Sequence, residues 1–327
     1  MPRGLVRVML TAVSILLALG GPLAAGAGSP WAMDVRGRWR PWKAPTVNSL
    51  ARLPAAERQA FAAALTRLAE PFRRVPPLNP PMGFEVAPYR AIEGGRPIRG
   101  VMWLAWYPYL RSCSTCPHSV YSDFLASFLL YVNDVEALFE VPHDKVAADE
   151  SGTLYREPRR LADLAGFPRY EQGVRNTAVV ITRRPAPILV PVSQARVIRA
   201  RIREVAQEAA RYERARDEWR ARAARERQRA LEAELAALSP PERAAPAYCC
   251  YGSSRPSGLS APDDPQARRV VAVNPALFDR AAPPQAFQLL IVEGRPPRNP
   301  DDPLRPAFDA VWATVDWRAF LAMLAGG

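Results

Sequence analysis

The sequence predicts an α+β fold, mainly an antiparallel sheet with flanking helices and one long Arg-rich helix. Three observations predict this class. Several short apolar and aromatic segments are bounded by turn residues, as strands usually are. The apolar segments 177–182 and 188–192 flank a Pro-bearing turn, which predicts an antiparallel hairpin. Residues 194–238 contain neither Pro nor Gly, which is typical of a helix.

The N-terminal 27 residues have the pattern of a secretory signal peptide. Arg3 and Arg7 supply positive charge, residues 8–19 are apolar, and Ala25-Gly26-Ala27 satisfies the small-x-small cleavage rule. The apolar stretch is too short to span a hydrocarbon core of about 30 Å comfortably. We therefore expect export, to the periplasm or out of the cell, after cleavage near Ala27. An uncleaved N-terminal anchor is the alternative.

Residues 28–47 are rich in Trp, Arg and Pro and lack periodicity, which predicts an extended arm. We expect a single α+β domain over residues 48–327, because no strong linker occurs before residue 193. Its first element is a helix from Pro54 to about Glu70, since Pro suits the first helical turn. Strands are predicted next at 83–89 and 100–110. Residues 125–132 fit a strand or a helix, and we favour a strand because Asn133-Asp134 ends it with turn residues.

The second half of the predicted sheet comes from four segments. Residues 177–182 (TAVVIT) and 188–192 (ILVPV) flank a Pro-bearing turn and predict a hairpin. Residues 269–273 and 287–292 are apolar and predict two more strands. The chain is expected to end in a short helix from about Asp316 that buries its large apolar side chains, which are Trp317, Phe320 and Leu321 or Leu324.

The segment 194–238 predicts a helix about 65 Å long, since each residue adds ~1.5 Å. Ser193 is its expected N-cap, and Ser239-Pro240-Pro241 ends it. The segment carries 12 Arg and 8 acidic residues. Four alternatives fit it: a helix or helical hairpin packed on its own domain, a coiled-coil homodimer, an isolated projecting helix, or a polyanion-binding helix. A Cys-bearing loop at 239–268 follows, and both segments are predicted as insertions.

The four cysteines are Cys113, Cys116, Cys249 and Cys250. In an oxidising compartment four cysteines most often form two disulfides, and we favour cross-links between the two Cys segments because a bond between adjacent cysteines is strained. Cys113-x-x-Cys116 after a strand also resembles a thioredoxin-type redox pair. A zinc site that uses this pair, and free thiols, are the remaining alternatives.

Aromatic residues mark two candidate binding segments. The strand predicted at 100–110 has rings on both of its faces, and sugar rings stack on such platforms, although core packing is the commoner use. The predicted long helix adds an apolar seam with two large rings. The candidate binding residues are therefore Trp103, Trp106, Tyr107 and Tyr109 in the strand, and Tyr212 and Trp219 in the helix.

The formal net charge of +12 and the motif content limit the function classes. Arg supplies 42 of the 44 basic residues, which is typical of a GC-rich genome, so we do not expect nucleic acid as a partner. Nucleophile-elbow, zinc-protease, P-loop and dinucleotide motifs are absent. His143-Asp144 would suit a general base with an orienting carboxylate, but sequence neighbours usually point apart. We assign no catalytic residue, metal or cofactor.

Two stretches resemble segments of uncharacterised exported bacterial proteins. The first is Thr177 to Thr182 followed by Ile188 to Ser193, and the second contains Val273-Asn274-Pro275, Phe278-Asp279 and Pro284-Gln285. The resemblance implies export and carries no catalytic residues to this chain.

These observations predict an exported, non-enzymatic binding or interaction protein of the cell envelope. Its partner would be an envelope protein or polymer. One alternative is an exported hydrolase that acts on cell-wall glycan or peptide, with His143 and an acid from a distant loop. Another is a thiol-disulfide protein that uses Cys113 and Cys116.

Overall fold

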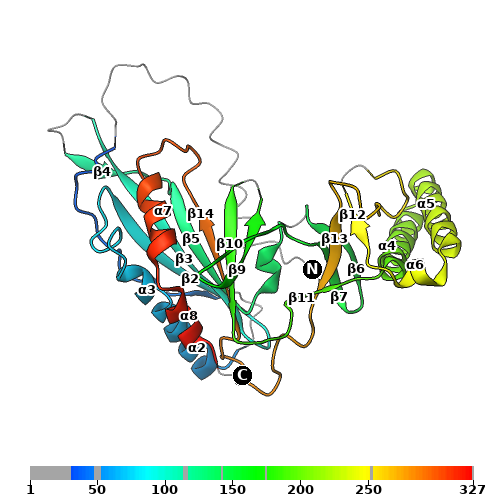
Figure 1. Ribbon diagram of the computed structural model, residues 1–327, viewed down its shortest axis with the longest axis horizontal. Coiled ribbons are helices and arrows are strands. Elements are labelled where there is room, and N and C mark those ends of the chain that lie inside the picture. Colours follow the sequence, from blue (N-terminus) through cyan, green and yellow to red (C-terminus); the bar gives the residue numbers. More distant parts are fainter. Residues whose placement is uncertain are drawn as a thin grey trace.

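The computed structural model describes residues 31–47, 53–112, 117–140, 143–173, 175–250 and 253–325. In these ranges the strands form two sheets, and helices pack on the outer face of each (Figure 1). The strand pairs are antiparallel except the short pair of β1 with β2. The predicted α+β class with mainly antiparallel strands is confirmed. The predicted signal peptide lies outside the described residues.

The larger sheet has nine strands in the described ranges. Its continuous order is β1 (Thr46–Val47), β2 (Phe84–Gly94), β3 (Arg99–Arg111), β5 (Ala126–Val132), β14 (Leu289–Arg295), β10 (Asn176–Thr182), β9 (Phe167–Gln172) and β8 (Arg160–Leu164), and β4 (His118–Val120) pairs with the end of β3. Four helices cover one face: α2 (Ala55–Arg67), α3 (Glu70–Arg73), α7 (Arg305–Thr314) and α8 (Trp317–Met323).

The main core lies between this face and the four helices. The rings of Phe128 in β5 and Phe308 in α7 are stacked with centroids 4.7 Å apart, and Trp106 of β3 lies beside both. Gly294 in β14 gives α7 the room to approach, because a Cβ at this position would lie 2.7 Å from the Trp312 ring. Aromatic packing therefore fixes the helices on this sheet.

The smaller sheet has five strands in the part of the chain that the structure describes. Its order is β11 (Leu189–Pro191), β13 (Arg268–Val273), β7 (Gly152–Arg156) and β6 (Lys145–Asp149), and β12 (Tyr248–Cys249) pairs with β13. A second apolar layer connects the two sheets. In it Phe139, which follows the 3₁₀ helix η1 (Val135–Leu138), stacks on Tyr155 of β7 at 3.9 Å, and Val180 of β10 packs in the same cluster as Val271 of β13.

Of the alternatives for 194–238, the structure shows the helical hairpin packed on its own domain, and the single uninterrupted helix over these residues is wrong. Helix α4 (Gln194–Arg214) and helix α5 (Glu218–Ala237) pack against each other at the far end of the smaller sheet (Figure 1). Arg216 has a φ of 57°, and Asp217 caps α5 by accepting from the Arg220 N–H. Folding back lets the apolar residues of both helices be buried, which one straight rod would leave exposed.

The predicted N-cap of this segment is confirmed, since the Ser193 hydroxyl accepts from the Arg196 N–H. The segment 239–268 has more structure than the predicted loop. Ser239 opens the short helix α6 (Pro240–Ala244) through a capping box with Glu242, and strand β12 follows.

The hairpin predicted from 177–182 and 188–192 is also wrong. Strand β10 already has a hydrogen-bonded neighbour on each side, β14 and β9, so it has no free edge for β11. After the Pro-bearing connector, β11 enters the smaller sheet and pairs with β13. Both segments are strands, as predicted, but they belong to different sheets.

Most of the other predicted elements are present. Helix α2 begins after Pro54 and helix α8 after the N-cap Asp316. Strand β5 ends at Val132, and the next residue, Asn133, has a φ of 55° and is buried. Four strands between residues 145 and 172, and helix α7, are not predicted by the sequence pattern.

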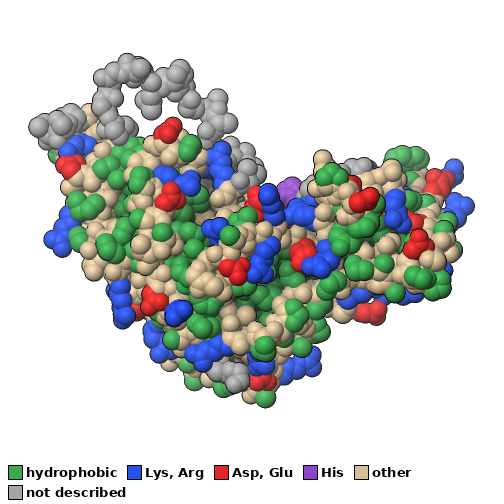
Figure 2. Space-filling model, viewed as in Figure 1, with side chains coloured by type: hydrophobic (Ala, Val, Ile, Leu, Met, Phe, Trp, Pro, Cys, Tyr) green, Lys and Arg blue, Asp and Glu red, His purple; other side chains and the backbone are tan. Residues whose placement is uncertain are grey.

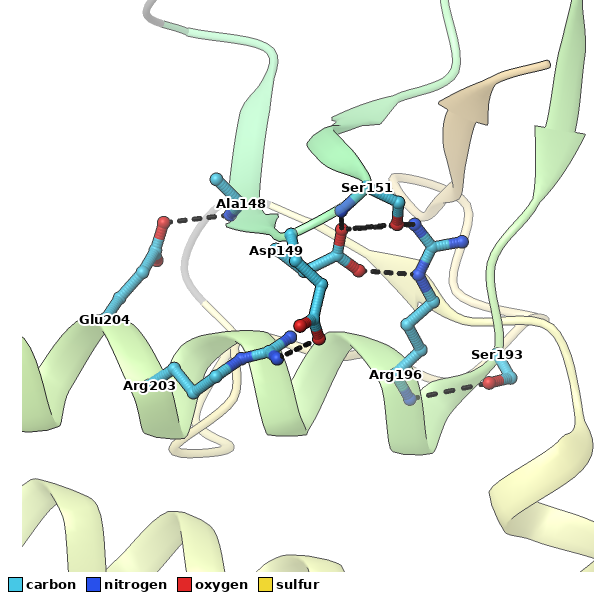
Figure 3. Close-up of polar contacts among 8 residues, drawn as sticks. Ala148, Asp149, Ser151, Ser193, Arg196, Arg203 and Glu204 are labelled. Atoms are coloured by element: carbon cyan, nitrogen blue, oxygen red, sulfur yellow. Dashed lines mark hydrogen bonds and ion pairs between the residues drawn. The ribbon is translucent and has the colours of Figure 1, made fainter. Parts of the chain in front are cut away.

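A set of ion pairs fastens α4 to the turn between β6 and β7 (Figure 3). Asp149 accepts from Arg196 Nε at 2.7 Å and from the N–H and hydroxyl of Ser151. About two turns further along α4, Arg203 pairs with Glu150 at 2.5 Å, and the Glu204 carboxylate accepts from the backbone N–H of Ala148 at 2.9 Å. The helical hairpin is therefore held to the sheet by charge as well as by apolar packing.

Candidate functional site

The structure separates the six candidate binding residues into three places. Trp106 is fully buried in the main core, where it stacks on Phe84 with centroids 4.5 Å apart. Trp103, Tyr107 and Tyr109 point to the opposite face of the larger sheet, because side chains alternate along β3. The remaining two, Tyr212 and Trp219, lie in the helical hairpin at the far end of the molecule (Figure 1).

The residues opposite the helix-covered face form what we call the aromatic face: Tyr89, Trp103, Tyr107, Tyr109 and Phe124. Tyr89 lies directly across from Trp103 in the β2–β3 pair, and their rings are 5.3 Å apart. The hydroxyls of Tyr89 and Tyr107 are 3.2 Å apart, and Phe124 meets the Trp103 ring edge-on at 4.7 Å. The four rings other than Tyr109 are half-buried, so their remaining surface is open to solvent.

The sheet positions beneath these rings are small. Ala87 and Ala105 face each other between the pair Tyr89–Trp103 and the pair Glu85–Tyr107, and both alanines are buried. Rings on either side can therefore lean together above them, as the contact between the two tyrosine hydroxyls shows.

A buried carboxylate lies at one end of the aromatic face. Glu85 accepts from Arg38 Nε at 2.9 Å, Arg40 Nε at 2.6 Å and the Tyr109 hydroxyl at 3.3 Å. Burial by itself raises the pKa of Glu85, but the hydrogen bonds from Arg40 and Arg38 outweigh it and leave the pKa below its usual value. Glu85 is therefore ionised at neutral pH.

The N-terminal arm supplies the cations of this site. Residues 36–47 run beside strand β2 and end in the short strand β1, and Trp39 bridges to Val86. This register directs Arg38 and Arg40 to Glu85, and the Arg40 guanidinium also lies 4.4 Å from the centroid of the Tyr107 ring. Burial and the hydrogen bond with Tyr89 raise the pKa of Tyr107, so the Tyr107 hydroxyl is a neutral hydrogen-bonding group.

Glu85, Tyr89, Arg38, Arg40 and Phe124 are parts of this site that are not in our set of candidates from the sequence. One signal was available: Glu85 is an acidic residue inside the apolar run FEVAPY, and Tyr89 shares its face at a spacing of four. The positions of Arg38 and Arg40 could not be predicted from the sequence. Residues 28–47 have no periodicity, so their register against β2 is not indicated.

The tip of the helical hairpin is the second place where candidate residues gather. Trp219 in the first turn of α5 is 75% exposed, the largest value among the exposed large hydrophobic side chains of the described residues. Tyr212 in α4 lies under two guanidinium groups, those of Arg211 and Arg220. These two aromatic residues do not contact the aromatic face.

The cysteines and His143 do not form a site among the described residues. Cys249 and Cys250 form no disulfide within the described residues, and burial raises the pKa of Cys249 to about 11. Cys113 and Cys116 lie outside the described residues, so the disulfide cross-links stay a prediction. His143 is exposed, whereas the carboxylate of Asp144 is buried and accepts from Arg156 at 3.1 Å.

Comparisons with known protein families, with curated proteins and with solved structures find no match for this chain. Within the described residues, no helix is long and apolar enough to cross a membrane. No group of three or more His, Cys, Asp or Glu side chains in these residues is arranged to hold a metal ion. The site is therefore interpreted from its own geometry.

Proposed function

We propose that the protein is an exported, non-enzymatic binding protein of the cell envelope and that the aromatic face holds its ligand, a carbohydrate polymer. The observation that carries the proposal is the group of partly exposed rings of Tyr89, Trp103 and Tyr107 beside an ordered, charged pair of Glu85 and Arg40. Sugars present both apolar C–H faces and hydroxyl groups, and this surface offers a partner for each.

The stacking part of the proposal rests on the rings. Trp103 and Tyr89 are neighbours across two strands, so their positions are fixed by the sheet and little ordering is needed when a ligand binds. Rigid rings with one open side are the usual means by which proteins gain contact area at low entropic cost.

The proposed polar contacts with the ligand depend on Arg40 of the N-terminal arm. Arg40 is held by Glu85 and by the Tyr107 ring, and its side chain is 31% exposed. Its guanidinium has five N–H donors, of which the bond to Glu85 uses one, so others can reach ligand hydroxyl or carboxylate groups. The tyrosine hydroxyls add further donors and acceptors.

The charge state of Glu85 favours binding over hydrolysis at this face. A general acid for glycosidic cleavage needs a raised pKa, and the hydrogen bonds from Arg40 and Arg38 lower the pKa of Glu85. The hydrogen bond of 2.6 Å from Arg40 Nε to Glu85 instead suits a carboxylate that holds the Arg40 side chain in position. The hydrolase alternative through His143 has no support from Asp144, whose carboxylate is directed to Arg156, Arg268 and the Glu140 N–H.

The test is co-sedimentation with insoluble cell-wall polysaccharide. We expect Trp103→Ala and Tyr107→Ala to weaken retention by about tenfold or more, because loss of a stacking contact worth ~1.4 kcal/mol has this effect. Tyr107→Phe keeps the ring and should retain most of the binding. Trp219→Ala removes an exposed tryptophan elsewhere and is the matched control.

Two outcomes contradict the proposal. The first is equal retention of the wild type, Trp103→Ala and Tyr107→Ala, with circular dichroism showing that the variants are folded. The second is turnover of the polysaccharide that disappears in Glu85→Gln or His143→Ala, which would favour the hydrolase.

A further inference from the structure

Three arginines approach one another between the smaller sheet and α4, whereas the aromatic face belongs to the larger sheet. Arg156 of β7 and Arg268 of β13 both contact Oδ1 of Asp144, at 3.1 and 3.5 Å. Arg201 of α4 lies close to Gly258. Its Nη2 is 3.8 Å from the position that a Cβ atom would take at residue 258. We call Arg156, Arg201 and Arg268 the arginine cluster.

Cys249 connects the three members of the cluster. It lies opposite Arg268 in the pair of β12 and β13, and it bridges to Leu259, the residue after Gly258. The Cys249 thiol is within electrostatic range of all three guanidinium groups. Burial nevertheless raises the pKa of this thiol to about 11, so it is neutral and supplies no negative charge.

The cluster has more positive than negative charge among the described residues. Asp144 is the carboxylate that Arg156 and Arg268 share. Glu234, the acid next to the segment 257–259, is already engaged by Arg255 at 2.8 Å and by the N–H and hydroxyl of Ser257. Arg156 and Arg268 therefore share the Asp144 carboxylate, and Arg201 has no ion pair of its own among the described residues.

Arg201 differs from its neighbours on the same helix. Arg196 and Arg203 each have a carboxylate partner, Asp149 and Glu150 (Figure 3). Within the described residues Arg201 makes no ion pair within 4 Å, and its Nε is buried without a hydrogen-bond partner. A cation in a largely buried layer costs free energy unless an anion compensates it.

We propose that the arginine cluster binds a phosphate-class oxyanion between α4 and the smaller sheet. Arg156, which has a side chain 5% exposed, would form the floor of the site, and Arg268, at 36% exposed, leaves a path to solvent. Guanidinium groups are the preferred partners of such oxyanions because their N–H donors match two oxygens at once.

The surface next to the cluster supports access by a small ion. A depression of about 530 Å³ is lined by Cys250 and Leu259, the chain neighbours of Cys249 and Gly258, and also by Arg255, Ser260 and Asp264. The Ser260 hydroxyl is buried and has no hydrogen-bond partner in the described part of the chain, so a donor is available at this edge. The proposal does not depend on the function of the aromatic face.

The test is thermal unfolding of the full chain with inorganic phosphate, combined with titration calorimetry. We expect phosphate to raise the melting temperature of the wild type in a saturable way. Arg201→Gln should abolish this increase and should raise the melting temperature of the ligand-free protein, because it removes an uncompensated charge. Arg203→Gln, whose partner is the exposed Glu150, is the control and should retain the phosphate effect.

Glycerol 3-phosphate is the second probe, and it separates a free ion from a phosphate ester. Saturable binding of either probe that Arg201→Gln and Arg268→Gln weaken at least tenfold supports the site. Equal affinity in the wild type and Arg201→Gln overturns the proposal, as does an Arg201→Gln protein that unfolds at a lower temperature and still binds phosphate.

Discussion

Asp149 and Arg196 join the turn of the β6–β7 hairpin to the first turns of α4 by a contact of 2.7 Å between Oδ2 and Nε. The hydrogen bond from Arg196 lowers the pKa of Asp149 to about 2, with Ser151 adding to the effect. The side chain of Asp149 is 4% exposed, so solvent screens the pair little. This contact makes the attachment of the helical hairpin dependent on pH.

We predict that acid weakens this attachment. The pKa of Asp149 is lower in the folded chain than in the unfolded chain, so its contribution is complete above about pH 4 and is lost as the pH falls towards 2. A shift of this size corresponds to about 2 kcal/mol. Urea unfolding of wild type and Asp149→Asn should differ by about this amount at pH 7 and converge near pH 2.

Glu150→Gln is the matched control for this prediction, because the Glu150 side chain is 83% exposed and its pair with Arg203 is screened by water. Equal stability of Asp149→Asn and the wild type at pH 7 would show that the contact between Asp149 and Arg196 does not hold the hairpin.

A second prediction concerns Gly294. A Cβ at this position would lie 2.7 Å from the Trp312 ring and 3.1 Å from Phe308. We expect Gly294→Ala to destabilise the protein by about 1–3 kcal/mol, the usual effect of overpacking. The penalty should be smaller in a Trp312→Leu background, and a double-mutant cycle of unfolding free energies measures the coupling. Additive penalties would contradict the packing of α7 on β14.

A third prediction concerns Asn133. Its side-chain amide donates to the carbonyls of Ile98 and Ala286, and its oxygen accepts from the N–H groups of Gln288 and Leu289. Asn133→Ala should cost about 2–4 kcal/mol, because buried backbone groups lose their partners. Chemical denaturation measures this cost. A loss below about 0.5 kcal/mol, the usual level of a surface substitution, would contradict the network.

A fourth prediction concerns the helical hairpin. The apolar side chains of α4 pack on the smaller sheet and α5, with Val197, Ile198, Ala200 and Leu231 buried in one cluster. We therefore expect no coiled-coil dimer through residues 194–238, and size-exclusion chromatography with light scattering should report a monomer. A dimer that Trp219→Ala and Tyr212→Ala disrupt would restore the self-association hypothesis.

The sequence predicts well where local pattern and capping decide the structure. Ser193 and Asp316 begin helices as expected, because each side chain accepts a hydrogen bond from the first turn. Strands β2, β3 and β5 are also found where alternating and apolar segments predict them. In these cases the relevant physics lies within a few residues.

Strand pairing and helix length could not be predicted in this way. The partner of β11 depends on which strand edges are free after β10 is flanked by β14 and β9. The break at Arg216 depends on burial of two apolar helix faces, and no Pro or Gly marks it in the sequence. Both outcomes are set by tertiary packing.

The candidate site was predicted in part. Trp103, Tyr107 and Tyr109 share one face, as β-strand alternation requires, and Trp106 belongs to the core for the same reason. Glu85 and Arg40 come from segments 45 residues apart in the sequence. Their contact depends on the register of the arm against β2, which local sequence pattern does not determine.

The most direct test of the central claim is a nitrogen-15 correlation spectrum of the tryptophan indole N–H groups during titration with soluble fragments of the envelope polysaccharide. The chain has 8 tryptophans, so assignment by single substitution is practical. The account predicts that the Trp103 indole signal shifts in a saturable way while the Trp219 and Trp106 signals stay in place. A shift of Trp219 with Trp103 unchanged would contradict it and would move the ligand surface to the helical hairpin.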